Sequence, residues 1–189
     1  GSAFGAAGQR CLAGSVAILV GTEEEQDRSL ANLVEGADAL RVGPGIDSAT
    51  DVCPLVSVAA RERVEGEIEA ALAEGAELAR DGRGDGGAGG AELGPTIIDD
   101  VKIGDECACD EIFGPVLTVL RVKTLSEAME IVNATPYGNA ASIYTSDGAT
   151  AAQFEDQAQA GMIGVNIGVP VPREPFSFGG WKNSRFGQG

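Results

Sequence analysis

Short apolar runs alternate with amphipathic segments along most of the chain, and these two patterns predict strands and helices in turn. Strands are predicted at 16–20, 116–122, 140–144 and 162–166. Helices are predicted from Thr22 through Ala37, over 57–80, from Thr124 to the stop at Pro136, and over 149–160. Strands separated by helices of this length need crossover connections. We therefore expect an α/β fold with three layers, in which a mostly parallel sheet is covered by helices on both faces.

The side-chain pattern also indicates where two helices begin and which face of another packs. Thr22 is followed three residues later by Glu25, and Thr124 by Glu127, which is the spacing of a capping box. In the helix predicted over 57–80, the apolar side chains form one stripe and the glutamates lie mostly outside it. That stripe is expected to face the core and the glutamates to face water.

Residues 82–94, with the sequence "GRGDGGAGGAELG", form the only low-complexity stretch and are expected to be a mobile surface loop. The loop contains the spacing GxGxxG at Gly82, Gly84 and Gly87, which is the pattern of a dinucleotide site. That pattern binds phosphate where a strand leads into a helix, whereas here it follows a predicted helix. We therefore do not assign a phosphate site to this loop.

The charge balance excludes some classes of partner. The chain has 189 residues, enough for one domain with a substantial core, and carries 29 acidic against 13 basic residues for a net charge of -16. Nucleic acid and anionic membranes both need clustered positive charge on a protein, and no apolar run approaches the roughly 20 residues of a membrane helix. We expect neither partner. The excess of acids has two explanations that stay open: a solvated acidic surface, or halophilic adaptation.

Cysteine and histidine usage narrows the chemistry. The cysteines Cys11, Cys53, Cys107 and Cys109 show no repeated CxxC spacing, and the chain has no histidine. The commonest zinc and haem ligands are therefore lacking, and we expect no metal site. Free thiols suit a reducing cytoplasm better than a disulfide framework does, which predicts a cytoplasmic protein.

Packing does not explain three stretches of the sequence: "GQRC" at 8–11, "DEIFGPV" at 110–116 and "PVPREPFSFGGWKNSRFG" at 170–187. Each mixes glycine or proline with polar and aromatic residues, which is expected at functional loops and also marks ordinary turns. Within the first stretch, Cys11 is a nucleophile, a metal ligand or an inert thiol. The positive charge of Arg10 favours a thiolate, which attacks an aldehyde far better than a hydroxyl does.

Taken in order, the three stretches resemble the aldehyde dehydrogenase superfamily, and "NATPYGNAASIYTSD" and "GMIGVN" extend the similarity over nearly the whole chain. The resemblance implies the fold of the family's catalytic domain, with Cys11 as the catalytic nucleophile. It also implies NAD as cofactor, with Glu111 at the ribose hydroxyls of the nicotinamide nucleotide and Phe113 beside the ring. Without the resemblance, Glu111 would be a solvated carboxylate and Phe113 a core aromatic.

The finer resemblance is to the methylmalonate-semialdehyde dehydrogenase branch, in which coenzyme A accepts the acyl group. It rests on the arginine of "GQRC", on "NATPYGN" and on "VPVPREPFSFGGWKNSRFG". It implies a small semialdehyde substrate and propionyl-CoA or acetyl-CoA as product. Arg10 would bind the substrate carboxylate, or merely balance the acidic surface. Phe176 and Phe178 would line the mouth of the substrate or acyl-CoA site, or pack the last turn.

Complete members of the family also have a cofactor-binding domain before the cysteine and a strand-bearing tail after the last motif. We therefore expect residues 1–189 to be a single catalytic domain that is inactive by itself, and the full-length enzyme to be a homo-oligomer. The opening Gly1-Ser2 resembles a cloning remnant. Two other interpretations stay open: a hydrolytic NAD(P)-dependent aldehyde dehydrogenase of another branch, and a non-catalytic remnant that serves subunit contacts.

Overall fold

The structure is a computed structural model that describes residues 1–86 and 90–185. The chain forms two compact units, residues 1–122 and residues 123–189. Among the described residues, no helix combines the length and the apolar character that a bilayer span requires. The loop predicted over 82–94, with Gly87 of its GxGxxG spacing, and the motif at 170–187 each extend into residues outside the described ranges.

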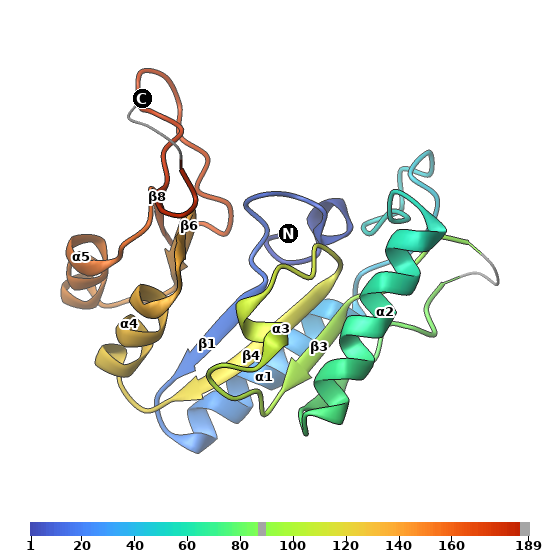
Figure 1. The fold of residues 1–189 in the computed structure, drawn as a ribbon, viewed down its shortest axis with the longest axis horizontal. Coiled ribbons are helices and arrows are strands. Elements are labelled where there is room, and N and C mark those ends of the chain that lie inside the picture. The colour runs from blue at the N-terminus through green and yellow to red at the C-terminus, as the bar shows by residue number, and fades with distance from the viewer. Residues whose placement is uncertain (87–89, 186–189) are drawn as a thin grey trace. The chain divides into compact units, whose positions relative to one another are not determined.

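The first unit is built on a four-stranded sheet (Figure 1). Its elements along the chain are the short turn η1 (Gly5–Gly8), β1 (Val16–Val20), α1 (Glu23–Asp38), α2 (Val58–Ala73), β2 (Glu77–Arg80), β3 (Thr96–Asp99), α3 (Glu106–Cys109) and β4 (Val116–Val122). The strand order is β1-β4-β3-β2. β4 runs parallel to both β1 and β3, whereas β2 is antiparallel to β3.

β4 lies inside this sheet and is covered on both faces. Residues 116–120 are all buried, although successive side chains of a strand point to opposite faces. Figure 1 shows α1 on one face of the sheet and α2 with α3 on the other. β1 is at the edge of the sheet and is therefore only partly buried. The predicted α/β class, with a mostly parallel sheet and helices on both faces, is confirmed.

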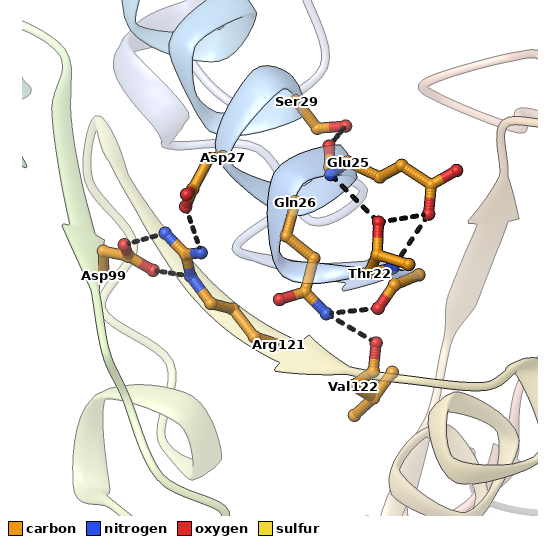
Figure 2. A network of polar contacts seen from close by, with 9 residues as sticks. Thr22, Glu25, Gln26, Asp27, Ser29, Asp99, Arg121 and Val122 are labelled. Atoms are coloured by element: carbon orange, nitrogen blue, oxygen red, sulfur yellow. Dashed lines mark hydrogen bonds and ion pairs between the residues drawn. The ribbon is translucent and has the colours of Figure 1, made fainter.

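α1 begins with the predicted capping box. The Thr22 hydroxyl accepts the amide N–H of Glu25 at 3.4 Å, and the Glu25 carboxylate accepts the amide of Thr22 at 2.8 Å. The hydrogen bonds that the amide and the hydroxyl of Thr22 donate to the Glu25 carboxylate hold the pKa of Glu25 below its usual value. One residue further on, the buried Gln26 donates its side-chain amide to the carbonyls of Gly21 at 3.0 Å and Val122 at 2.7 Å (Figure 2). The start of α1 is thereby tied to the ends of β1 and β4.

An arginine on β4 ties the same helix to the sheet a second time. Arg121 donates two hydrogen bonds to Asp99 of β3, at 3.0 and 2.6 Å, and one to Asp27 of α1 at 2.6 Å (Figure 2). Burial alone would raise the pKa of Asp99, but the hydrogen bonds from Arg121 and from the amide of Asp100 outweigh it and lower that pKa. Asp99 is therefore held as a carboxylate.

The prediction of one helix over 57–80 is wrong. α2 ends at Ala73 because Gly75 takes a φ of +103°, which a residue with a Cβ rarely adopts. The amides of Gly75 and Ala76 donate to carbonyls in the last turn of α2, both at 3.1 Å, as in a Schellman motif. The following residues form β2, and β3 was also not predicted.

The second unit pairs two helices with two small sheets. Its elements are α4 (Leu125–Ala134), β5 (Tyr137–Gly138), β6 (Ala140–Ile143), α5 (Gly148–Gln157), β7 (Met162–Val165) and β8 (Trp181–Lys182). β6 and β7 are parallel, and β5 pairs antiparallel with β8. Met129, Phe154 and Ala158 form its buried core. The capping box predicted at Thr124 is present at the start of α4, and both strands predicted in this unit are confirmed.

Candidate active site

The turn η1, which precedes the "GQRC" motif, has an unusual backbone. Ala6, Ala7 and Gly8 have φ values of +55°, +53° and +68°, so three consecutive residues are left-handed. A left-handed conformation costs an L-residue roughly 1–2 kcal/mol. Ala7 is completely buried and Leu12 nearly so, which indicates that tertiary packing holds this turn in place.

Cys11 lies at an exposed corner directly after this turn. The amide of Ala13 donates to the carbonyl of Arg10 at 2.9 Å, which closes a tight turn around the cysteine. The amide of Gly14 then donates to the carbonyl of Ser2 at 3.1 Å and joins both ends of the segment. A thiol in this position is accessible to a small molecule.

Gly8, the first residue of "GQRC", brings the segment 8–13, called the cysteine turn below, into direct contact with the "DEIFGPV" motif. A Cβ at Gly8 would lie 1.9 Å from the carbonyl oxygen of Gly114, so only glycine permits this approach of the two backbones. Gln9 is also anchored, because its side-chain Oε1 accepts the amide of Val56 at 2.8 Å. The "GQRC" and "DEIFGPV" motifs therefore meet at Gly8 and Gly114.

Glu111 and Phe113 both present their side chains to solvent. Glu111 is exposed and Phe113 is 38% exposed, whereas Ile112 between them is buried and anchors the turn. Phe113 has a φ of +49°, which is an outlier for a bulky residue. From α2, Arg63 donates its Nη2 to the carbonyl oxygens of Ile112 at 2.6 Å and Phe113 at 3.5 Å.

The guanidinium of Arg10 folds back over η1. Its Nη2 donates to the carbonyl of Gly1 at 3.2 Å, and its terminal atoms lie over the Cα of Gly5. The Nε of Arg10 is buried and has no hydrogen-bond partner among the described residues. A buried N–H without an acceptor costs about 1–3 kcal/mol, so this group is suited to a further acceptor.

The other cysteines differ from Cys11 in surroundings. Burial, with the nearby charges of Asp105 and Glu74, raises the pKa of the Cys107 thiol to about 11. Cys109 is exposed and Cys53 is partly buried. In the part of the chain that the structure describes, no group of three or more cysteine and carboxylate side chains could hold a metal ion.

The two remaining candidates, Phe176 and Phe178, belong to the second unit. They are 76% and 59% exposed. Phe176 lines a groove of about 420 Å³ together with Ile167, Val171 and other uncharged residues. Cys11, Glu111 and Phe113 thus all lie in the first unit, on segments whose backbones meet at Gly8 and Gly114, whereas the two phenylalanines are exposed in the second unit.

Sequence reasoning missed three residues that position this site: Val56, Arg63 and Val64. The amide of Val56 holds Gln9, and a Cβ at Gly114 would lie 2.7 Å from a methyl group of Val64. The helical pattern marked Val64 as a core residue but gave no indication of what it touches. Nothing in the local sequence distinguishes Arg63 from a solvated arginine.

The first unit thus carries an exposed thiol after a constrained turn, and an exposed carboxylate and aromatic ring on a second segment whose backbone meets that turn at Gly114. Comparison with known proteins specifies the class. The model of the aldehyde dehydrogenase family matches residues 1–189. The chain therefore belongs to the aldehyde dehydrogenase family.

Several similar proteins are named as dehydrogenases of semialdehydes. A malonate-semialdehyde dehydrogenase from Pseudomonas aeruginosa is 46% identical over 190 residues, 99% of this chain and 38% of that protein. The solved methylmalonate-semialdehyde dehydrogenase from Oceanimonas doudoroffii is 40% identical with a TM-score of 0.94, over 99% of this chain and 39% of that one. A protein from Sinorhizobium meliloti 1021, assigned as a methylmalonate-semialdehyde dehydrogenase and complexed with NAD, has the same identity and TM-score over 99% and 38%. This chain thus spans about 38% of the length of the curated relatives it matches.

Proposed function

We propose that this chain is the catalytic part of an NAD-dependent, CoA-acylating dehydrogenase of methylmalonate or malonate semialdehyde. The observation that carries the proposal is the backbone contact between Gly8 and Gly114. It joins the segment that carries the exposed Cys11 to the segment that carries Glu111 and Phe113, as a nucleophile that works beside a bound coenzyme would require. The names of the relatives support a semialdehyde as substrate.

Cys11 would supply the covalent chemistry. Its thiolate attacks the aldehyde carbon, the carbonyl electrons move to the oxygen, and a thiohemiacetal forms. The backbone N–H of Cys11 is the local candidate for stabilising the oxyanion. NAD, when bound, accepts the hydride that leaves this carbon. Cys11 then carries the acyl group as a thioester. The thiolate of CoA attacks the thioester carbon and the Cys11 thiolate leaves, so that acyl-CoA is released and the cysteine is restored. The acyl group loses its carboxylate as CO2, and a proton from water takes its place on the α-carbon.

The residues of the second turn fit a dinucleotide. The Glu111 carboxylate is exposed and accepts hydrogen bonds, as the hydroxyls of a ribose require. The Phe113 ring is partly exposed beside it and offers an apolar surface to a nicotinamide. The strained φ of Phe113 supports a functional role, because such outliers gather at binding sites.

Two further groups would bind the substrate. Arg10 directly precedes the nucleophile in the sequence, and a guanidinium suits a substrate carboxylate because it can donate to both oxygens. Phe176 lines an apolar groove and Phe178 is exposed nearby in the sequence, which suits an acyl chain or the arm of CoA. We assign these two roles on chemistry alone.

Alkylation of cysteines tests the nucleophile, with Cys109 as the control inside the same chain. Both thiols are exposed, so accessibility alone gives similar rates. At neutral pH we expect iodoacetamide to modify Cys11 about tenfold faster than Cys109, measured by peptide mass, because thiolate character sets the rate. An equal or slower rate at Cys11 contradicts the proposal and supports a non-catalytic chain. The variants Cys11→Ser and Cys109→Ser confirm the assignment of each peptide.

The acyl acceptor is tested in the full-length enzyme, meaning a polypeptide of the relatives' length that carries this chain. With malonate semialdehyde and NAD, we expect steady-state turnover to depend on CoA and acetyl-CoA to accumulate. Turnover that is independent of CoA would instead identify a hydrolytic dehydrogenase.

We also propose that the full-length enzyme works in the cytoplasm as a homo-oligomer. The support for the compartment is chemical, because a catalytic thiol must stay reduced. The mass of the full-length enzyme in solution tests the oligomer, and a monomer contradicts it.

A further inference from the structure

α2 contacts both turns of the candidate active site. At its start, the amide of Val56 donates to the side chain of Gln9 in the cysteine turn at 2.8 Å. Two turns further along, the side chain of Val64 packs so closely against Gly114 that a Cβ there would lie 2.7 Å away. Val64 is completely buried, so this contact is part of the core. α2 and the segment that leads into it therefore contact both motifs of the candidate site.

Arg63 controls the backbone on either side of Phe113. Its Nη2 donates to the carbonyl of Ile112 at 2.6 Å and to that of Phe113 at 3.5 Å. These two carbonyls belong to the peptide planes before and after the Cα of Phe113. Because the orientations of the two planes define φ and ψ of the residue between them, holding both carbonyls fixes both angles.

Phe113 needs such a restraint. Its φ of +49° is unfavourable for a bulky side chain and persists only where the surroundings impose it. The buried side chain of Ile112 anchors one side of the turn, and the amide of Val116 donates to the carbonyl of Gly114 at 2.8 Å on the other. Among the described contacts, those of Arg63 are the ones that act on the strained residue itself.

We infer that Arg63 is a positioning residue, which holds the Glu111–Phe113 turn in the conformation that binds the coenzyme. The inference rests on the proposed function of that turn. Arg63 acts through the carbonyls of Ile112 and Phe113 and need not touch the coenzyme. Its loss would let Phe113 leave the left-handed region and would turn the Glu111 carboxylate away from the ribose.

Arg61 provides a matched control on the same helix. It donates to a backbone carbonyl, that of Gly90, at 3.0 Å, and pairs with Glu65 four residues on. Arg63 likewise donates to a backbone carbonyl and pairs with Glu67 four residues on. Arg61→Met and Arg63→Met thus remove the same kinds of bond, but only the second acts on the turn.

Hydrogen exchange of the chain itself tests the structural half of the inference. In Arg63→Met we expect the amide of Val116 to exchange about tenfold faster, because the turn that accepts it opens locally. The amide of Val56, bound to the cysteine turn, serves as the internal control and keeps its rate. Arg61→Met leaves both rates unchanged. Equal effects of the two variants on Val116 would overturn the inference.

Steady-state kinetics of the full-length enzyme tests the functional half. Arg63→Met should raise KM for NAD about tenfold while kcat stays within about twofold, because a charge-assisted hydrogen bond is lost. Arg63→Lys, which keeps one donor, should recover part of the loss, and Arg61→Met should match wild type. A merely structural role would instead lower kcat and the yield of active enzyme together in Arg63→Met.

Glu111→Gln separates this inference from the function on which it rests. If that variant leaves KM for NAD unchanged, the coenzyme role of the turn fails and Arg63 positions nothing for NAD. If it raises KM for NAD while Arg63→Met does not, the proposed function survives and the positioning role of Arg63 is refuted.

Discussion

Replacing Gly8 by alanine should force apart the two turns of the candidate active site. The new Cβ would lie 1.9 Å from the carbonyl oxygen of Gly114 and 2.4 Å from its carbonyl carbon. Neither atom belongs to a flexible side chain, so the backbones themselves must separate. Moving the closest pair from 1.9 Å to 3.4 Å, the near limit of ordinary van der Waals contact, requires an opening of about 1.5 Å.

Two costs contribute to the expected loss of stability. Gly8 has a φ of +68°, and a residue with a Cβ costs roughly 1–2 kcal/mol in that region. Overpacking a close contact costs a further 1–3 kcal/mol, roughly. We therefore expect Gly8→Ala to lower the free energy of unfolding by about 2–5 kcal/mol, a large part of the roughly 5–15 kcal/mol that stabilises a domain.

Urea unfolding measures this effect, with Gly66→Ala as the matched control. Gly66 lies inside α2, where a Cβ would meet nothing within 4 Å. That variant should gain about 0.5–1 kcal/mol, because alanine favours a helix over glycine. In Gly8→Ala the alkylation rate of Cys11 should also fall toward that of Cys109. An unfolding free energy within about 0.5 kcal/mol of wild type, with unchanged alkylation, would refute the close approach.

Four other outcomes are expected. Ala6→Gly should raise the free energy of unfolding by about 1 kcal/mol in urea, because Ala6 is left-handed and exposed and so loses no burial; a loss of stability contradicts the strain. Arg121→Met should cost about 1–3 kcal/mol at pH 7, between the values of surface and buried pairs. The pKa of Asp99 is lowered in the folded state, so its contribution is present above the unfolded pKa near 4 and is lost as pH falls through the folded value. The difference between wild type and variant in urea unfolding should therefore shrink as pH falls below about 4, and a constant difference contradicts this. Raising KCl from about 0.1 to about 1 M should raise the Tm, because salt screens the self-repulsion of a net charge of -16. A lower Tm at high salt argues against halophilic adaptation. The isolated chain should give no burst of NADH with malonate semialdehyde in stopped-flow absorbance, and a burst shows that it suffices for catalysis.

The parts of the fold that local sequence determines could be predicted. The capping boxes at Thr22 and Thr124 join residues three apart, and the structure has both. The end of α2 could not be predicted in the same way. Residues 77–80 read "ELAR", which consists of good helix formers, yet they pair with β3 as a strand. Pairing with a strand about 20 residues away outweighs this preference, and no local pattern records it.

The candidate site was only half accessible to sequence reasoning. The types of residue in "GQRC" and "DEIFGPV" indicated where the chemistry lies, because a thiol, a carboxylate and an aromatic ring each suit a definite role. The contact that joins the motifs depends on Gly8 and Gly114, which are 106 positions apart. A glycine in the sequence indicates only that a side chain would not fit at that position, and not which backbone lies close to it. The restraint by Arg63 was invisible for a related reason, since a charged residue on an amphipathic helix predicts a solvated face.

Backbone strain is found in the candidate site, where prediction from the local sequence also failed. Of the six non-glycine residues with positive φ among those described, Ala6, Ala7 and Phe113 lie in the two turns that touch each other. Nothing in the sequence Ala-Ala encodes a left-handed turn, so the conformation is imposed by burial of Ala7 and by the contact at Gly8. Backbone strain that tertiary contacts maintain lowers the stability of a fold. Such strain is expected where a functional site must be held in one conformation. The mismatch between local preference and observed conformation therefore occurs in the same two segments that carry Cys11 and Glu111, and it is seen independently of any motif.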